Sequence, residues 1–350
     1  MKFTFLAAFL AATLSAQVIR SVPYNLVRLD PSIDSILTAD SPLEVLGEHF
    51  GLTEGPVWVS DANGGYLLFS DCAANVIYKW QANAPLSVFL ERSGFTGQNN
   101  LDVGQQTIAG RLAILLIGSN GLALDPQGRL IITAMADRTL VRLEKDGKRT
   151  TLADRYDGKR FSGPNDLTIK SNGSIYFADS VNGLRGGGDS PQRELPYNGF
   201  FLLKDGKLTL LGGDRDRPGE APNGIALSPD EKTLYVTAGF RKTMQYDVLP
   251  DDTVANPRVF IEAGNDGIKT DNQGNVYQVN AVGQGEILIT AASGKRLGTI
   301  QLPQIPGEPR ARVCASNVAF GDADGKTLYI TSCTHLFRIR LKASGLRPSR

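Results

Sequence analysis

The stretch that decides the fold is Ala221-Pro-Asn-Gly-Ile-Ala-Leu-Ser-Pro-Asp-Glu-Lys-Thr-Leu-Tyr-Val-Thr237. It predicts a short buried strand over 225–227, a polar turn over 228–232 and a second strand over 233–237, because Ser-Pro-Asp-Glu-Lys is turn chemistry between two apolar segments. Asn223 stands directly before the first strand. The same unit recurs along the chain with a polar residue in that place, and this recurrence indicates both the fold and the candidate site.

Six copies of the unit can be aligned. We call the polar residue that precedes the first strand of each copy its anchor, and the anchors are Glu54, Asn120, Asn165, Asn223, Asp266 and Ser316, which lie 66, 45, 58, 43 and 50 residues apart. Irregular periods of this size, each with several short strands, are typical of a β-propeller. The sequence therefore predicts an all-β chain with one six-bladed β-propeller over residues 51–342.

The segments outside the propeller have their own signals. Residues 1–16 hold one Lys, an apolar run and Ser15-Ala16, which is typical of a signal peptide. A membrane anchor is the alternative, but the apolar run is short for a membrane span, so we expect a secreted or periplasmic protein. Residues 17–50 form a lead-in that we expect to wrap the propeller or to supply an outer strand that closes the ring. Residues 343–350 form a C-terminal tail.

Composition excludes some partners. The chain has 37 basic and 36 acidic residues, a formal net charge of +1, and no basic run. This balance argues against nucleic acid and anionic membranes as partners. Once the signal peptide is removed, we expect no membrane association, and we expect a monomer.

The chain has three cysteines. Cys314 and Cys333 flank the hairpin of the sixth copy, and counting outward from its turn places them opposite each other. A cross-strand disulfide is therefore expected in an oxidising compartment, with two unpaired buried thiols as the alternative. Cys72 is left over, and we expect it to be a buried small apolar residue.

The anchors are the candidate functional residues. In a propeller the first strand of each blade lines the central channel, so residues just before those strands converge at one mouth. All six anchors carry oxygen, and two carboxylates with amide oxygens suit a hard divalent cation, Ca²⁺ or Mg²⁺ rather than Zn²⁺. The alternative is that Asn-Gly and Asp-Gly are turn dipeptides. That explanation accounts for some anchors individually, but it does not account for Glu54, which precedes Gly-Pro.

With these residues in hand, the chain resembles the senescence-marker-protein/gluconolactonase family of six-bladed propellers. The resemblance covers roughly residues 40–342 and is carried by an ordered set of motifs: Glu54-Gly-Pro-Val-Trp, Ser119-Asn-Gly-Leu-Ala-Leu-Asp, Pro164-Asn-Asp-Leu, Glu194-Leu-Pro-Tyr-Asn-Gly, Pro222-Asn-Gly-Ile-Ala-Leu-Ser and Asp266-Gly-Ile-Lys. It implies one catalytic divalent metal, commonly Ca²⁺ or Zn²⁺, at the channel mouth. The implied ligands are Glu54, Asn165, Asn223 and Asp266, and Asn120 maps to a substrate-facing position.

Three functions compete at this point. The first is a lactonase, in which the metal polarises the carbonyl and Asp266 acts as general base or nucleophile, or serves only as a ligand while a metal-activated water attacks. The second is hydrolysis of a phosphotriester or organofluorophosphate on the same site. The third is a non-catalytic propeller that binds a partner, since the fold alone does not fix function.

Overall fold

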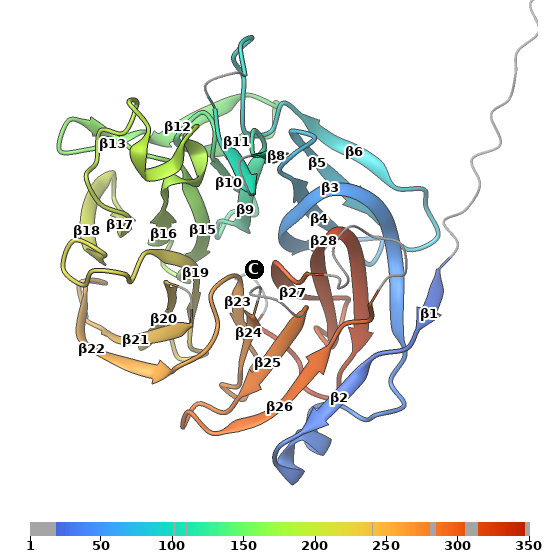
Figure 1. The fold of residues 1–350 in the computed structure, drawn as a ribbon. Helices are drawn as coiled ribbons and strands as arrows, with labels where there is room; N and C mark the ends of the chain where they lie inside the picture. Colours follow the sequence, from blue (N-terminus) through green and yellow to red (C-terminus); the bar gives the residue numbers. More distant parts are fainter. Residues whose placement is uncertain are drawn as a thin grey trace, which may run out of the picture.

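The computed structural model describes residues 19–100, 103–108, 111–239, 241–280, 285–304 and 314–346. The sheets of this all-β chain surround a common centre (Figure 1). Helical structure in the described residues is confined to three short 3₁₀ turns: η1 (Pro31–Ser35), η2 (Val181–Gly183) and η3 (Gly187–Asp189). No helix in these residues is long and apolar enough to cross a membrane, whereas residues 1–16, the predicted signal peptide, lie outside them.

Three antiparallel sheets of four strands each follow the chain in order. The first contains β9 (Ser119–Leu124), β10 (Leu130–Ala134), β11 (Thr139–Leu143) and β12 (Arg149–Ala153). The second contains β15 (Pro164–Ile169), β16 (Ile175–Asp179), β17 (Gly199–Lys204) and β18 (Lys207–Gly213). The third contains β19 (Pro222–Leu227), β20 (Thr233–Ala238), β21 (Lys242–Val248) and β22 (Val254–Ile261).

Two larger sheets and two small ribbons complete the described strands. The five-stranded sheet contains β23 (Ile268–Thr270), β24 (Val276–Asn280), β25 (Glu286–Thr290), β26 (Arg296–Gln301) and β2 (Asn25–Arg28). The seven-stranded sheet contains β27 (Asn317–Gly321), β28 (Thr327–Arg340), β3 (Leu43–Val59), β4 (Tyr66–Asp71), β5 (Val76–Trp80), β6 (Ser87–Glu91) and β1 (Arg20–Val22). The ribbons are β7 (Gln105–Ile108) with β8 (Arg111–Leu115), and β13 (Arg155–Tyr156) with β14 (Lys159–Arg160).

The β19–β20 hairpin shows why the repeated unit folds. Ser228 and Asp230 build the turn: Ser228 Oγ donates to Asp230 Oδ1 (2.6 Å) and accepts the N–H of Thr233 (2.9 Å). Glu231 takes a positive φ of 57°, which reverses the chain. The apolar residues of both strands are buried, so the predicted strand–turn–strand unit is confirmed.

The first strands of the units form a ring around the centre. Neighbouring strands contact each other in the order β3, β9, β15, β19, β23, β27 and back to β3. The hydrophobic core lies between adjacent sheets rather than in one block. One cluster, for example, joins Tyr176 and Phe200 of one sheet to Ile225, Leu234 and Val236 of the next. Each sheet therefore holds its inner strand in place by packing on its two neighbours.

The ring closes through two strands that change partner along their length. The first part of β28 pairs with β27, and its second part pairs with residues 43–48 of β3. Leu341 N donates to Lys326 O (2.8 Å), so β28 folds back on itself around Cys333, which has a positive φ of 41°. Residues 53–59 of β3 then pair with β4. The N-terminal segment thus supplies the outer strand beside the C-terminal hairpin, which covers an edge that would otherwise stay open.

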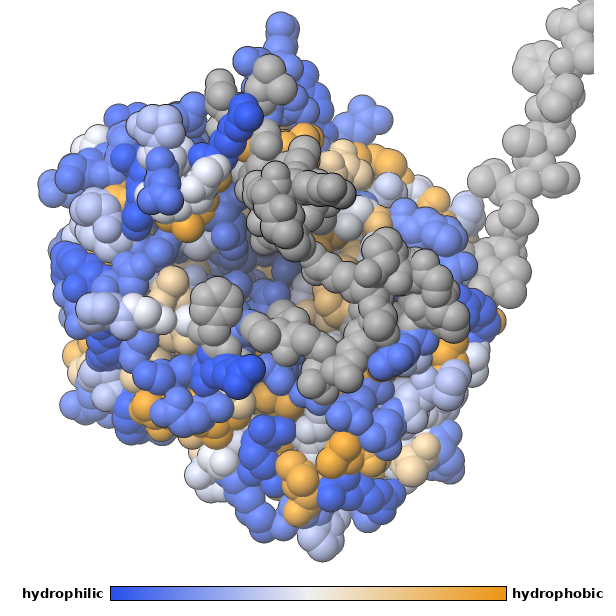
Figure 2. Space-filling model, viewed as in Figure 1, coloured by the Kyte–Doolittle hydropathy of each residue, from blue (hydrophilic) through white to orange (hydrophobic). Residues whose placement is uncertain are grey.

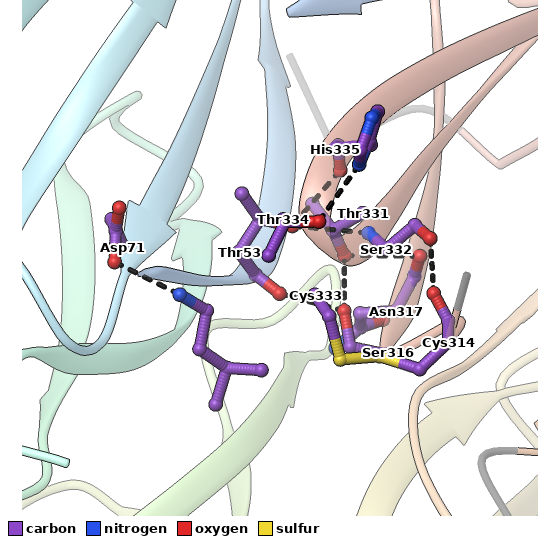
Figure 3. The surroundings of a disulfide bond; sticks show 11 residues. Thr53, Asp71, Cys314, Ser316, Asn317, Thr331, Ser332, Cys333, Thr334 and His335 are labelled. Atoms are coloured by element: carbon purple, nitrogen blue, oxygen red, sulfur yellow. Dashed lines mark hydrogen bonds between the residues drawn. A yellow bond between two sulfur atoms is a disulfide. The ribbon is translucent and has the colours of Figure 1, made fainter. Parts of the chain in front are cut away.

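The predicted disulfide between Cys314 and Cys333 is confirmed, with the two Cα atoms 5.6 Å apart (Figure 3). The register differs slightly from the expectation: Asn317 pairs with Thr331, so Cys333 lies one position short of the residue directly across from Cys314. A loop of this size contributes about 3 kcal/mol in the chain-entropy model. Cys72 is free and buried, as expected, and burial raises the pKa of its thiol.

Candidate functional site

The anchors stand at matching places on the inner strands. Asn120, Asn165 and Asn223 are each the second residue of β9, β15 and β19, Glu54 lies inside β3, and Asp266 lies two residues before β23. Glu54, Asn120 and Asn165 are buried, whereas Asn223 and Asp266 are half-buried. Figure 2 shows a recess near the middle of the ring on the face seen in Figure 1.

Glycines next to the anchors let neighbouring inner strands approach closely. Gly55 has a φ of +48°, and a Cβ there would lie 2.0 Å from the carbonyl oxygen of Asn120. A Cβ at Gly267 would lie 2.2 Å from Cγ of Asn317. These positions require glycine because no side chain fits between the strands. The glycine after an anchor therefore serves ring packing, and the anchor itself carries the polar group.

Hydroxyl groups on the second strands fix the anchors' backbones. Thr237 Oγ1 accepts the N–H of Gly224 (2.6 Å) and donates to the carbonyl of Asp266 (2.9 Å), and Thr133 Oγ1 makes the equivalent bonds to Gly121 and Asn165. Each threonine thus clamps the anchor of the next sheet to its own. The signal for these residues was in the sequence, since Ile-Ile-Thr-Ala and Tyr-Val-Thr-Ala occupy the same place in their units.

Ser316, the sixth anchor, plays a different part. Its Oγ donates to the carbonyl of Thr53 (2.6 Å) and lies within hydrogen-bond distance of Thr331 Oγ1 (3.0 Å) across the ring closure (Figure 3). It is therefore tied to the strand before Glu54 and offers no free donor to the mouth. Asn317, the next residue, approaches Glu54 instead: its Nδ2 donates to Glu54 Oε2 (3.4 Å).

Glu54 and Asp266 share one electrostatic environment. Burial, followed by the charge of Asp166, raises the pKa of Glu54 to about 7. Burial, the charge of Glu54 and the charge of Asp166 raise the pKa of Asp266 well above its ordinary value. The hydrogen-bond partners of Glu54 in the described residues are the Gly55 N–H (3.1 Å) and the Asn317 amide, neither of which carries a charge. The two carboxylates therefore repel each other without a cation between them.

The amide anchors complete the arrangement. Asn223 hydrogen-bonds the Asp266 side chain, which holds the pKa of that carboxyl lower than burial alone would. Asn165 Nδ2 donates to Ser180 Oγ (3.4 Å), so its amide oxygen is the atom it can offer to a cation. Asn120 Oδ1 is buried and has no hydrogen-bond partner among the described residues. An orphaned buried acceptor of this kind suits a ligand that brings a donor.

Two charged residues of this site were missed from the sequence. Asp166 is buried, its charge acts on both Glu54 and Asp266, and its Oδ2 lies 3.4 Å from Nζ of Lys269 on β23. Asp166 follows an anchor, where the other units have Gly or Asn, and the pattern of the repeated unit assigns no role to this position. A comparison of the position after each anchor would have found it.

The donor set fits a hard divalent cation. In the described residues no three His, Cys, Asp or Glu side chains lie together as a metal cluster, so a metal here would need the asparagine oxygens as well. Glu54 and Asp266 supply two negative charges, and Asn165 and Asn223 supply neutral oxygens. A divalent cation would relieve the repulsion between the two carboxylates, and oxygen-only donors favour Ca²⁺ or Mg²⁺.

Comparison with known proteins tests the resemblance that the motifs show. The sequence profile of the SMP-30/Gluconolactonase/LRE-like region matches residues 52–334. The chain belongs to this family. A gluconolactonase from Zymomonas mobilis is 34% identical over 337 residues, which cover 92% of this chain and 87% of that protein. The resemblance seen in the motifs is therefore confirmed.

Solved structures of the family have the same fold. A gluconolactonase from Xanthomonas campestris is 26% identical and superposes with a TM-score of 0.73 over 94% of this chain and 99% of its own. Regucalcin from Agrobacterium tumefaciens, described as a calcium-binding protein, is 18% identical, with a TM-score of 0.61 over 87% and 98% of the two chains. The second likeness shows the fold alone.

Proposed function

We propose that this protein hydrolyses a lactone at the anchor mouth of a six-bladed β-propeller. Six inner strands contact one another in a closed circuit, and the two parts of the seven-stranded sheet count as separate blades. The observation that carries the proposal is the pair of carboxylates formed by buried Glu54 and half-buried Asp266, which repel each other and lie beside the amides of Asn223 and Asn317. The gluconolactonases among its relatives support a lactone as the class of substrate.

One divalent cation, Ca²⁺ in our proposal, would be held by Glu54, Asn165, Asn223 and Asp266. When bound, it supplies a Lewis acid for the lactone carbonyl and for the oxyanion that forms on it. Asp266, the more exposed of the two carboxylates, accepts the proton of the attacking water at a side-chain oxygen and returns it to the ring oxygen as the bond between that oxygen and the carbonyl carbon breaks. Asn120, with its unpartnered Oδ1, accepts a hydrogen bond from a hydroxyl of the substrate. That contact favours a hydroxylated sugar lactone over an aliphatic one.

Hydrolysis of a panel of sugar and aliphatic lactones, with and without a chelator, tests this function. We expect turnover of sugar lactones that the chelator abolishes and that added Ca²⁺ restores. An aryl phosphotriester in the same panel separates the alternative hydrolase from the lactonase. No turnover of any substrate, together with no metal in the purified protein by elemental analysis, would favour a non-catalytic propeller.

We further propose that the protein is exported and that residues 1–16 are removed. The Cys314–Cys333 disulfide supports this proposal, because disulfides persist in oxidising compartments. The mass of the protein recovered from the periplasm or medium of an expressing bacterium should correspond to a chain that begins near Gln17. Full-length protein confined to the cytoplasm would contradict it.

A further inference from the structure

The position after each anchor separates the six units into two kinds. It is glycine in four of them, whereas Asp166 and Asn317 occupy it in the other two, and both are buried. Each of these side chains uses Oδ1 to accept the N–H of the following residue at 2.9 Å. The rest of each side chain is then free to reach another inner strand. Asn317 reaches Glu54, and Asp166 reaches Lys269.

Lys269 brings a positive charge into an acidic region. It lies on β23, and its Nζ is 3.4 Å from Oδ2 of Asp166 on β15, so the ion pair bridges two inner strands that are not neighbours. The Lys269 side chain is 24% exposed and that of Asp166 is 3% exposed. A charge this sheltered is weakly screened by water and acts on every carboxylate nearby. Its field also reaches Glu54 and favours the ionised form of that residue.

The charges can be followed one by one. Glu54, Asp166 and Asp266 would together place three negative charges near the anchor mouth, since the charge of Asp166 acts on both of the others and the charge of Glu54 acts on Asp266. Pairing with Lys269 cancels the charge of Asp166. The remainder is two negative charges, from Glu54 and Asp266, which match the charge of one divalent cation.

We propose that Lys269 sets the charge of the cation that the anchor mouth accepts, by cancelling Asp166. This inference rests on the proposed function, because it concerns the same metal site. Lys269 is a positioning residue in this role: it acts through Asp166 and touches neither metal nor substrate. Without Lys269, three carboxylates face the ion, so the affinity for a trivalent cation rises relative to the affinity for a divalent one. Without Asp166, the ammonium is uncompensated and repels any cation.

Cation binding by the full chain tests this proposal without relying on activity. The metal-free protein is titrated with Ca²⁺ by calorimetry and with Tb³⁺ by luminescence at pH 7, for wild type, Lys269→Met, Asp166→Asn and the double variant. Asp166→Asn should weaken Ca²⁺ binding about tenfold or more, and Lys269→Met should raise the Tb³⁺ to Ca²⁺ affinity ratio about tenfold. The double variant should return both quantities to within about threefold of wild type.

Two controls keep the result interpretable. Lys269→Arg preserves the charge and should bind both ions as wild type does. Lys204→Met removes a lysine that pairs with a buried carboxylate elsewhere, Asp252 at 2.7 Å, where Lys170 remains as a second partner, and it should leave cation binding unchanged. Circular dichroism and thermal melting establish that each variant is folded.

The outcomes separate the proposal from its premise. A double variant that binds Ca²⁺ as weakly as Asp166→Asn would overturn the proposal, because Asp166 would then act as a ligand itself. Single variants with unchanged affinities and an unchanged ratio would also overturn it and leave the ion pair a purely structural contact. Wild-type protein that binds neither ion would instead overturn the proposed metal site.

Discussion

The two ends of the ring's central passage are lined by the same inner strands and differ in what they bury. At the anchor end, the strands begin with carboxylates and amides, and neither Glu54 nor Asp266 forms an ion pair within the part of the chain that the structure describes. Further along the same strands lies a cavity of about 280 Å³, lined mainly by apolar side chains such as Val57, Leu122 and Ile169. The anchor end carries groups that weaken the fold when buried, whereas the apolar groups that dominate the cavity end stabilise it. Lys269, the partner of Asp166, also lines this cavity.

This contrast indicates where function resides. A buried polar group without a partner costs free energy, and a fold keeps such groups where a ligand uses them. Apolar walls around a cavity need no such explanation, because they continue the packing between neighbouring sheets. The anchor mouth holds the charged groups that a cation would neutralise, and for this reason we place the proposed chemistry there. A cavity therefore need not mark the site in this fold, since a larger cavity of about 520 Å³, lined by residues such as Asp125, Arg142 and Leu203, contains no anchor either.

The largest effect should come from Asp266→Asn at the anchor end. Removing the proton acceptor, which is also one of two charges for the cation, should lower kcat/KM for a sugar lactone by about 10²–10⁴-fold. The metal-free variant should melt no lower than metal-free wild type, because the substitution relieves repulsion with Glu54. Steady-state kinetics and thermal melting of both chelated proteins measure the two quantities. Near-normal turnover would mean that Asp266 is neither base nor essential ligand.

The opposite result is expected at the cavity end. Leu122→Ala removes a buried side chain from the cavity wall and should lower the free energy of unfolding by about 2–5 kcal/mol. The folded variant should keep its kcat/KM and its metal affinity, because no anchor changes. Denaturant unfolding and kinetics at a temperature where the variant is folded check both. A loss of metal affinity in the folded variant would show that the two ends are not independent.

The sequence predicted the repeated unit because each copy carries its own local signals. Asn223 with the Ser-Pro-Asp turn shows the whole pattern in one stretch, and the hairpin forms where expected. Glu54 stood out because no turn explains it, and its place beside Asp266 follows from the closed ring. These local signals recur in each copy of the unit, so several copies in one chain support the same prediction.

Features that depend on contacts between units could not be predicted in this way. Ser316 matches the pattern of an anchor, yet ring closure uses its hydroxyl to hold Thr53. Asp166 carries no signal of its own in the repeated unit, and its pairing with Lys269 joins residues 103 positions apart in sequence. The register between Cys314 and Cys333 shifts by one position because Cys333 already belongs to the bend of β28. The periodicity of the sequence contains no information about such contacts between units.

The smallest effect we predict concerns the threonine that holds Asp266 from the neighbouring sheet. Thr237→Val keeps the shape of the side chain and removes the hydroxyl that accepts from Gly224 N and donates to the carbonyl of Asp266. The buried Gly224 N–H then lacks its partner, which should cost about 1–3 kcal/mol of stability. Because Asp266 loses one backbone restraint and keeps its side chain, kcat should fall about tenfold or less, and Ca²⁺ affinity should fall by a similar factor.

A matched substitution separates this clamp from a general effect of losing a hydroxyl. Thr290 on β25 is fully buried, and its Oγ1 has no hydrogen-bond partner among the described residues, so Thr290→Val should be neutral or stabilising and should leave kcat unchanged. Thr237→Ser keeps the hydroxyl and should retain wild-type kcat with a small loss of packing. If Thr237→Val lost stability but kept kcat and Ca²⁺ affinity, the threonine would hold the sheets together without positioning the site. If Thr237→Ser were as impaired as Thr237→Val, the methyl contact rather than the hydrogen bond would be what places Asp266.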